Sequence, residues 1–212
     1  MAVTYQNAAS DATKRVLANC FYVPPVQREV SGYTLSGTWA KGTVIPMGTP
    51  IVADTATKSA TICKYAVVEK KVDAKNFILE DLGFLAEGDK FFISGAESPA
   101  LSTISAIDKA TRKITLSANN SDLKAGDVIV EGKSVTTGEG QSAVTTISAV
   151  NIPNRIVSHT ATLGESDKTV SGTYQCVAIQ NVLKYPEEFL NKTTFPGSVL
   201  LVGCPTIHFV TI

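Results

Sequence analysis

LAEGDKFFI at residues 85–93 and LKAGDVIVE at residues 123–131 are two versions of one pattern, a Gly-Asp pair that leads into an apolar run. Similar segments precede both versions. They are VVEKKVD (67–73) and FIL (77–79) before the first, and ISAID (104–108) and KITL (113–116) before the second. The pattern predicts an imperfect duplication, in which each copy is a strand, a polar turn, a second strand, a loop, Gly-Asp and a third strand.

The turn residues support this interpretation. Asp73 and Asp108 stand where the two hairpins must reverse, and an aspartate at the start of a turn can accept hydrogen bonds from the backbone two residues on. Gly88 and Gly126 provide the conformational freedom needed before each third strand. Three strands cannot complete a core alone, so we expect the two copies to pair their apolar faces in one small barrel or sandwich.

The composition extends the β prediction to the rest of the chain. Thr and Val together supply more than a fifth of the 212 residues, and β-branched side chains suit a pleated surface better than a helix. We therefore expect an all-β fold, mostly strand with one short N-terminal helix or arm. Its form would be a β-sandwich or barrel that carries the duplicated β-hairpin module as an insertion.

Three parts are predicted along the chain: an N-terminal arm (1–20), an outer β-domain (21–65 and 133–212) and the inserted duplicated module (66–132). Residues 133–150 are rich in Ser, Thr and Gly and are expected to form a return linker or an exposed loop. In the outer domain, GTVIPMGTPIV (42–52) predicts two apolar strands separated by a turn at Pro46 and Gly48.

Charge and hydropathy bear on the class of partner. Lys plus Arg and Asp plus Glu number 19 each, whereas a nucleic-acid binder usually carries a basic excess. No apolar stretch approaches the roughly 20 residues that span a bilayer, and the N-terminus lacks a secretory pattern. We expect a protein made in a cytoplasm, with neither nucleic acid nor membrane as its partner.

Candidate chemistry is sparse. The four cysteines (Cys20, Cys63, Cys176 and Cys204) are widely spaced, so we expect reduced, buried thiols. His159 and His208 have no cysteine or carboxylate at ligand spacing, and Cys204 and His208 are expected on one face of a strand but about 13 Å apart. We predict no catalytic, metal or cofactor site. The alternative is an enzyme whose site assembles from scattered residues, with the two histidines as its best candidates.

Three segments together resemble the capsid decoration and head-fibre proteins of tailed bacteriophages and prophages. They are the Pro-Met-Gly-Thr-Pro element of a hairpin at 42–51, the repeated hairpin module, and the closing segments at 181–183 and 197–207. The sequence departs from the family pattern before Val182, where Gln180-Asn181 replaces a glycine. The resemblance implies an auxiliary structural protein of the virion that sits on the major capsid protein, as a homotrimer, with no catalytic residues.

The candidate partner contact is the run Phe21, Tyr22, Val23, Pro24 and Pro25, which proline keeps extended. Aromatic side chains on an extended segment suit docking, and packing onto the chain's own sheet is the equal alternative. The second functional hypothesis is a phage tail or baseplate part, or a cell-surface carbohydrate-binding β-module. For that hypothesis Trp39 is the candidate sugar platform, although a lone Trp is more often core.

Overall fold

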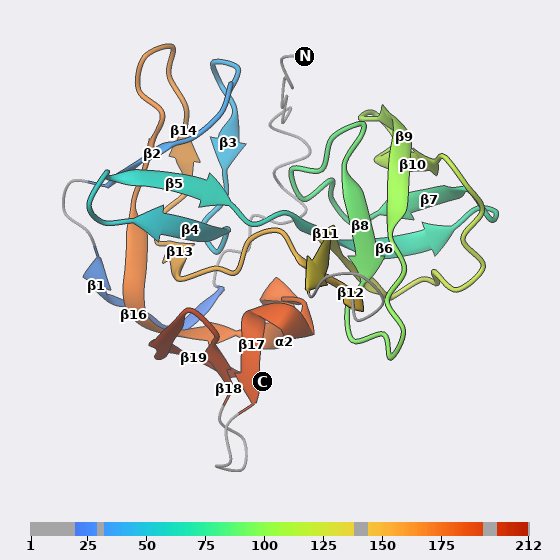
Figure 1. The fold of residues 1–212 in the computed structure, drawn as a ribbon. Helices are drawn as coiled ribbons and strands as arrows, with labels where there is room; N and C mark the ends of the chain where they lie inside the picture. The colour runs from blue at the N-terminus through green and yellow to red at the C-terminus, as the bar shows by residue number, and fades with distance from the viewer. Residues whose placement is uncertain (1–19, 29–31, 138–143, 193–198, 212) are drawn as a thin grey trace. The chain divides into compact units, whose positions relative to one another are not determined.

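The fold is nearly all β in a computed structural model that describes residues 20–28, 32–137, 144–192 and 199–211. This confirms the all-β class. The expected arm and short helix before Cys20 lie outside the described residues. The chain divides into two compact units, each described by itself: an inserted unit, Lys64–Val150, and a discontinuous unit formed by Met1–Cys63 and Asn151–Ile212 (Figure 1).

The inserted unit is a closed six-stranded barrel with one additional strand. Its strands are β6 (Tyr65–Lys71), β7 (Asn76–Leu79), β8 (Lys90–Ile93), β9 (Ser102–Asp108), β10 (Lys113–Leu116), β11 (Val128–Thr137) and β12 (Val144–Ala149). Neighbours pair in the order β11-β6-β7-β10-β9-β8, and β8 pairs with β11 to close the ring. All these pairs are antiparallel.

The predicted duplication is present as strands β6–β8 and β9–β11, related by an approximate two-fold axis. Phe77 of β7 lies opposite Ile114 of β10, the equivalent residue of the other copy. Phe92 of β8 likewise lies opposite its equivalent, Val130 of β11. The third strands are exchanged, because β8 pairs with β9 of the second copy and β11 pairs with β6 of the first.

The two Gly-Asp turns have matching hydrogen bonds, which confirms their structural role. Asp89 Oδ2 accepts from Ala86 N at 2.7 Å, and Asp127 Oδ2 accepts from Lys124 N at 2.7 Å. Each glycine has a positive φ and donates its N–H to the first strand of the other copy, which is the neighbouring strand in the barrel. The acceptors are Ile104 O for Gly88 and Val68 O for Gly126, both at 2.8 Å.

Alternation along the strands fills the barrel with apolar side chains from both copies. The buried residues that form this core are Ala66, Val68, Phe77, Leu79, Leu85, Phe91, Ile104, Ile114, Leu116, Leu123 and Ile129. Neither copy could bury this surface alone, because each contributes only one side of the core.

The boundaries of the insertion differ from the sequence prediction. Residues 133–150 were expected to belong to the outer domain as a linker or loop, but the inserted unit extends to Val150. The reason is that β11 continues past residue 132 and pairs residue by residue with β12, from Gly132 opposite Ala149 to Thr137 opposite Val144. The described part of this segment is a two-stranded ribbon.

The discontinuous unit contains a ten-stranded mixed sheet in the order β15-β2-β5-β4-β13-β16-β19-β18-β17, with β1 also paired to β16. Its strands are β1 (Phe21–Arg28), β2 (Tyr33–Leu35), β4 (Pro50–Asp54), β5 (Ser59–Ile62), β13 (Arg155–Val157), β15 (Thr169–Val170), β16 (Gly172–Ile179), β17 (Leu190–Lys192), β18 (Val199–Leu201) and β19 (Cys204–Val210). A helical turn, α2 (Gln180–Leu183), and a 3₁₀ turn, η2 (Glu187–Phe189), follow β16.

The expected hairpin at residues 42–52 is wrong in its pairing. The turn at Pro46 and Gly48 is present, but β3 (Val44–Ile45) pairs with β14 (Ala161–Thr162) in a separate two-stranded sheet, while β4 pairs with β5 and β13. Gly48 has a φ of 86° and donates to Val157 O. A Cβ there would lie 2.6 Å from Leu183 Cδ2, so the turn is held against other elements and redirects the chain between sheets.

Candidate functional site

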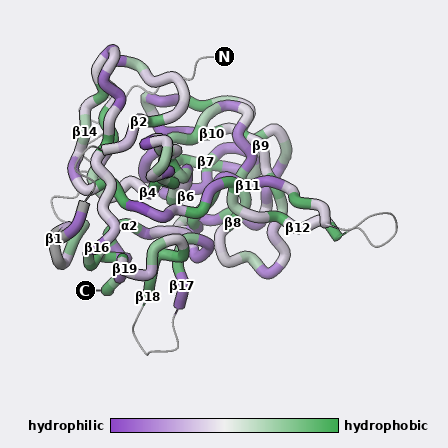
Figure 2. Tube along the Cα trace, turned by 60° about the vertical axis from the view of Figure 1, so that its left-hand side comes forward, coloured by the Kyte–Doolittle hydropathy of each residue, from purple (hydrophilic) through white to green (hydrophobic). Residues whose placement is uncertain are grey.

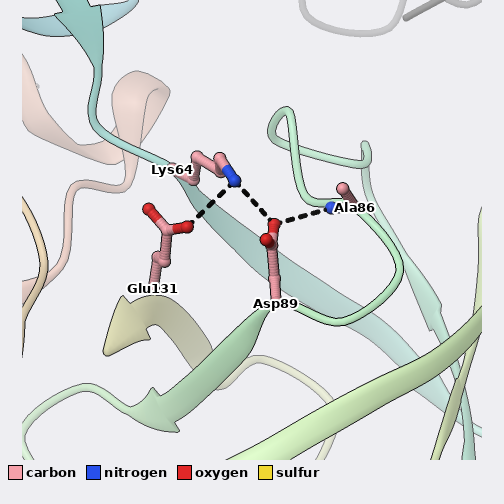
Figure 3. A network of polar contacts seen from close by, with 4 residues as sticks. All are labelled: Lys64, Ala86, Asp89 and Glu131. Carbon is pink, nitrogen blue, oxygen red and sulfur yellow. Dashed lines mark hydrogen bonds and ion pairs between the residues drawn. The ribbon is translucent and has the colours of Figure 1, made fainter. Parts of the chain in front are cut away.

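Lys64, the first residue of the inserted unit, forms ion pairs with two carboxylates. Lys64 Nζ lies 2.8 Å from Asp89 Oδ2 and 2.9 Å from Glu131 Oε1. Figure 3 shows the ammonium group between the two carboxylates, with Asp89 also accepting from the Ala86 N–H. Because all three charged side chains are largely buried, screening by solvent is weaker here than for a surface pair.

The Lys64 network joins the beginning and the end of the inserted unit. Glu131 N donates to Lys64 O at 3.1 Å, and Val150 N donates to Glu131 O at 2.9 Å. The network is asymmetric, since the two-fold relation that matches Val68 with Ile104 places Ala100 at the position equivalent to Lys64. Both carboxylates are engaged by the ammonium group, so the network is suited to fixing strands rather than to proton transfer.

The histidines occupy exposed positions on the discontinuous unit. His159 follows β13, and its Nδ1 lies 2.9 Å from Ser158 Oγ. Ser158 is buried, and its hydroxyl also donates to Ser171 O at 3.1 Å. The hydrogen bond to Ser171 O keeps the Ser158 hydroxyl group inside the fold. This oxygen is therefore not positioned to attack a substrate. His208 lies on β19 opposite Leu200 of β18, and its side chain is exposed.

Cys204 and His208 do not share a face of β19, which corrects the sequence expectation. Cys204 is buried, whereas His208 is exposed. The cause is a register shift between β18 and β19, because Leu200 pairs with His208 but the next residue, Leu201, pairs with Cys204. Such an irregularity breaks the period-two alternation on which the expectation rested.

All four cysteines are buried and free of disulfides, as the sequence predicted. Burial raises the pKa of Cys20 to about 12, and burial together with the neighbouring thiols of Cys20 and Cys204 raises that of Cys176 to about 12. The Cys20 and Cys176 thiols are therefore protonated at neutral pH, and a protonated thiol is a poor nucleophile and metal ligand.

The candidate contact segment Phe21–Pro25 forms the first part of β1. Phe21 is buried and pairs with Ala178 of β16, while Tyr22 is 62% exposed. Pro25 is half-buried, and the side chains of Val23 and Pro24 lie outside the described residues. The segment is extended as predicted, and it both packs onto the chain's own sheet and presents one large aromatic side chain outward.

Trp39 lies in the loop between β2 and β3 and is half-buried. Its indole Nε1 donates to Ser36 O at 2.9 Å, a bond within the same loop. The indole N–H is therefore used within the loop.

The chain matches no family model, no curated protein and no solved structure. In the described ranges, no group of three or more His, Cys, Asp and Glu side chains is arranged to hold a metal ion. No helix in that part of the chain is long and apolar enough to cross a membrane.

Sequence reasoning missed the Lys64 network, although two of its members lie in the repeated pattern. Asp89 belongs to the Gly-Asp pair of the first copy, and Glu131 ends the matching segment of the second copy. Lys64 lies in no motif, and it meets Glu131 only because β6 and β11 are neighbours in the barrel.

Proposed function

We propose that this protein is a structural component of a tailed-phage virion, which decorates or stabilises the capsid surface or anchors head fibres. Its partner would be the major capsid protein, and it would act as a homotrimer. The sequence resemblance motivates the proposal. The proposal is supported by the fold of the chain into two β units. The polar contacts described above, around Lys64 and around Ser158, connect strands and turns to one another.

The observation that carries the proposal is the arrangement of β1. A tyrosine that is 62% exposed stands next to a buried phenylalanine that anchors the strand to β16. Aromatic side chains are favoured at the centres of protein interfaces because they bury a large area at a small cost in conformational entropy. Tyr22 is thus the side chain of this segment best placed to contact a capsid subunit.

The test begins with phage particles purified from the organism that encodes the chain. Mass spectrometry should find this protein in the particles at a copy number comparable with that of the capsid protein. Particles that lack it would overturn the proposal.

The contact itself is tested by adding purified protein to particles that have been stripped of it. We expect Tyr22→Ser to weaken capsid binding at least about thirtyfold, the loss that marks an interface hot spot. Val72→Ser is the matched control, because Val72 is 52% exposed on the inserted unit and should bind as the native protein does. Equal binding by both variants would contradict the role of β1.

A carbohydrate-binding module, on a cell surface or in a phage tail or baseplate, is the second candidate, and the partly exposed position of Trp39 in its loop favours it. Aromatic faces stack on the apolar faces of sugars. A glycan array should then show binding that Trp39→Ala abolishes. An array without a binder would leave the capsid proposal as the better supported one.

A further inference from the structure

The ribbon formed by residues 132–137 of β11 and by β12 has open edges. Among the residues that the structure describes, β12 pairs only with β11, and beyond Glu131 β11 pairs only with β12. The six successive pairs have no register shift. Figure 2 shows the ribbon leaving the barrel toward the right-hand side of the view.

The parity of the ladder identifies the backbone groups at these edges. Val150 N donates to Glu131 O, so that pair and every second pair along the ribbon exchange the ladder bonds. The intervening pairs, such as Thr136 with Thr145, therefore direct their N–H and C=O groups outward. Their side chains stand close together, as the 3.0 Å contact between the two hydroxyl groups requires. On the outer edge of β12 the outward groups belong to Thr145, Ile147 and Ala149.

The other edge strands of the described chain are protected against pairing with another strand. β1 contains Pro24 and Pro25 and has three register shifts against β16. β3, β14 and β15 have two residues each and β17 has three, and very short edge strands offer few backbone groups for pairing. β12 is the exception, because its six residues include no charge, no proline and no bulge.

The chemistry of the ribbon favours a second ribbon as its occupant. β12 reads VTTISA and has no charged side chain. The only charge on residues 132–137 is Lys133, whose Nζ contacts Val150 O at 3.4 Å within the same unit. A charged partner would find a single cation, Lys133, and no carboxylate on these residues, whereas β-branched Thr, Val and Ile side chains pair well with their own kind across strands.

We propose that copies of this chain associate through the ribbon, with the outer edge of β12 pairing with the outer edge of residues 132–137 in the next copy. This head-to-tail contact covers both open edges of each ribbon when the ring closes. A ring of three agrees with the homotrimer proposed above. The inference itself needs no capsid, so it is tested separately on the purified protein.

The test compares two substitutions at one position by sedimentation across a concentration series. Thr145→Pro removes an outward N–H without removing a ladder bond to β11, whereas Thr145→Val keeps the N–H and removes the same hydroxyl. The native chain and Thr145→Val should form an oligomer, three times the mass of one chain if the ring holds three copies. Thr145→Pro should raise the concentration needed for assembly at least about tenfold.

Hydrogen exchange provides a second measurement that does not depend on how well the proline variant folds. In the native protein, the amides of Thr145 and Ile147 should be protected at high concentration and should lose that protection on dilution. A native chain that stays monomeric at high concentration would overturn the proposal. An oligomer whose assembly is unaffected by Thr145→Pro, with both amides unprotected, would overturn it as well.

Discussion

At the scale of single residues, glycines and aspartates set the turns that bring the strands together. Gly83 has a φ of 54°, and a Cβ on it would lie 1.6 Å from Tyr65 O. Asp73 accepts from Lys75 N at 2.7 Å and from Asn76 N at 2.9 Å, which confirms the predicted turn aspartate. Asp108 does the same in the second copy, where Ala110 N donates to it at 3.0 Å.

The close approach at Gly83 leads to a stability prediction. Gly83→Ala should lower the free energy of unfolding by about 3 kcal/mol or more, because overpacking against backbone adds to the cost of a positive φ. Gly126→Ala is the matched control, since Gly126 also has a positive φ but nothing within 4 Å of the added Cβ. Its loss should be about 1–2 kcal/mol. Equal losses in urea unfolding would contradict the clash.

The turn aspartates lead to a pH prediction. The backbone N–H of Lys75 and the side chain of Asn76 lower the pKa of Asp73, and the Thr111 side chain and nearby backbone N–H groups lower that of Asp108. Because the folded-state pKa lies below the unfolded value near 3.9, this stability is present above that value. It is lost as the pH falls through the folded pKa.

The double variant Asp73→Asn/Asp108→Asn tests the pH prediction, because asparagine can still accept the turn hydrogen bonds but does not titrate. Between pH 5 and pH 2, its urea midpoint should fall less steeply than that of the native protein. Identical slopes would assign the acid sensitivity to other groups, such as Asp54 and Asp167, whose pKa values are also lowered by turn hydrogen bonds.

At the scale of elements, the sequence predicted strands better than it predicted their partners. The strands of the duplication lie where the repeated apolar runs placed them, since a run and its turn are local properties. The ribbon formed by residues 132–137 and 144–149 was missed because Ser and Thr are common in loops and because both of its faces are largely exposed. That exposure removes the apolar alternation that marks a half-buried strand. The pairing of β3 with β14, across more than a hundred residues, has no local signal.

The Lys64 network can be tested at this scale. Lys64→Met leaves Asp89 and Glu131 without their shared cation, and their side chains are each only 16% exposed. We expect a loss of about 1–3 kcal/mol in the free energy of unfolding, because partly buried carboxylates lose their counter-charge. Lys192→Met is the matched control. The 2.9 Å pair of Lys192 with Glu187 has side chains 68% and 59% exposed, and its removal should cost less than about 0.5 kcal/mol.

At the scale of the whole molecule, the chain enters and leaves the inserted unit at one place. Lys64 and Val150 both bond to the backbone of Glu131. In the discontinuous unit, Cys63 N donates to Pro50 O and Asn154 N donates to Ile51 O, so the two broken ends meet beside β4. Each unit therefore has nearby ends and its own core, which are the properties of an independently folding domain.

Two fragments test this independence. Residues 64–150 expressed alone should unfold cooperatively in urea, with strand content by circular dichroism that matches a closed barrel. The remaining chain, with Cys63 joined to Asn151 by a short Gly-Ser linker, should also fold. A fragment of residues 64–150 without a cooperative transition would show that the barrel depends on the rest of the chain.

The exchange of third strands has a consequence for the history of the barrel. In a peptide that holds only one copy, the first strand would lack its partner, because that partner is the third strand of the other copy. In solution, a second molecule of the same peptide could supply this third strand. A dimer of two identical peptides that exchanged their third strands in this way would place Phe77 of one peptide opposite Phe77 of the other, across an exact two-fold axis. In the present barrel, Phe77 and Ile114 are paired at this place. The present barrel has the geometry that tandem fusion of such a pair would leave.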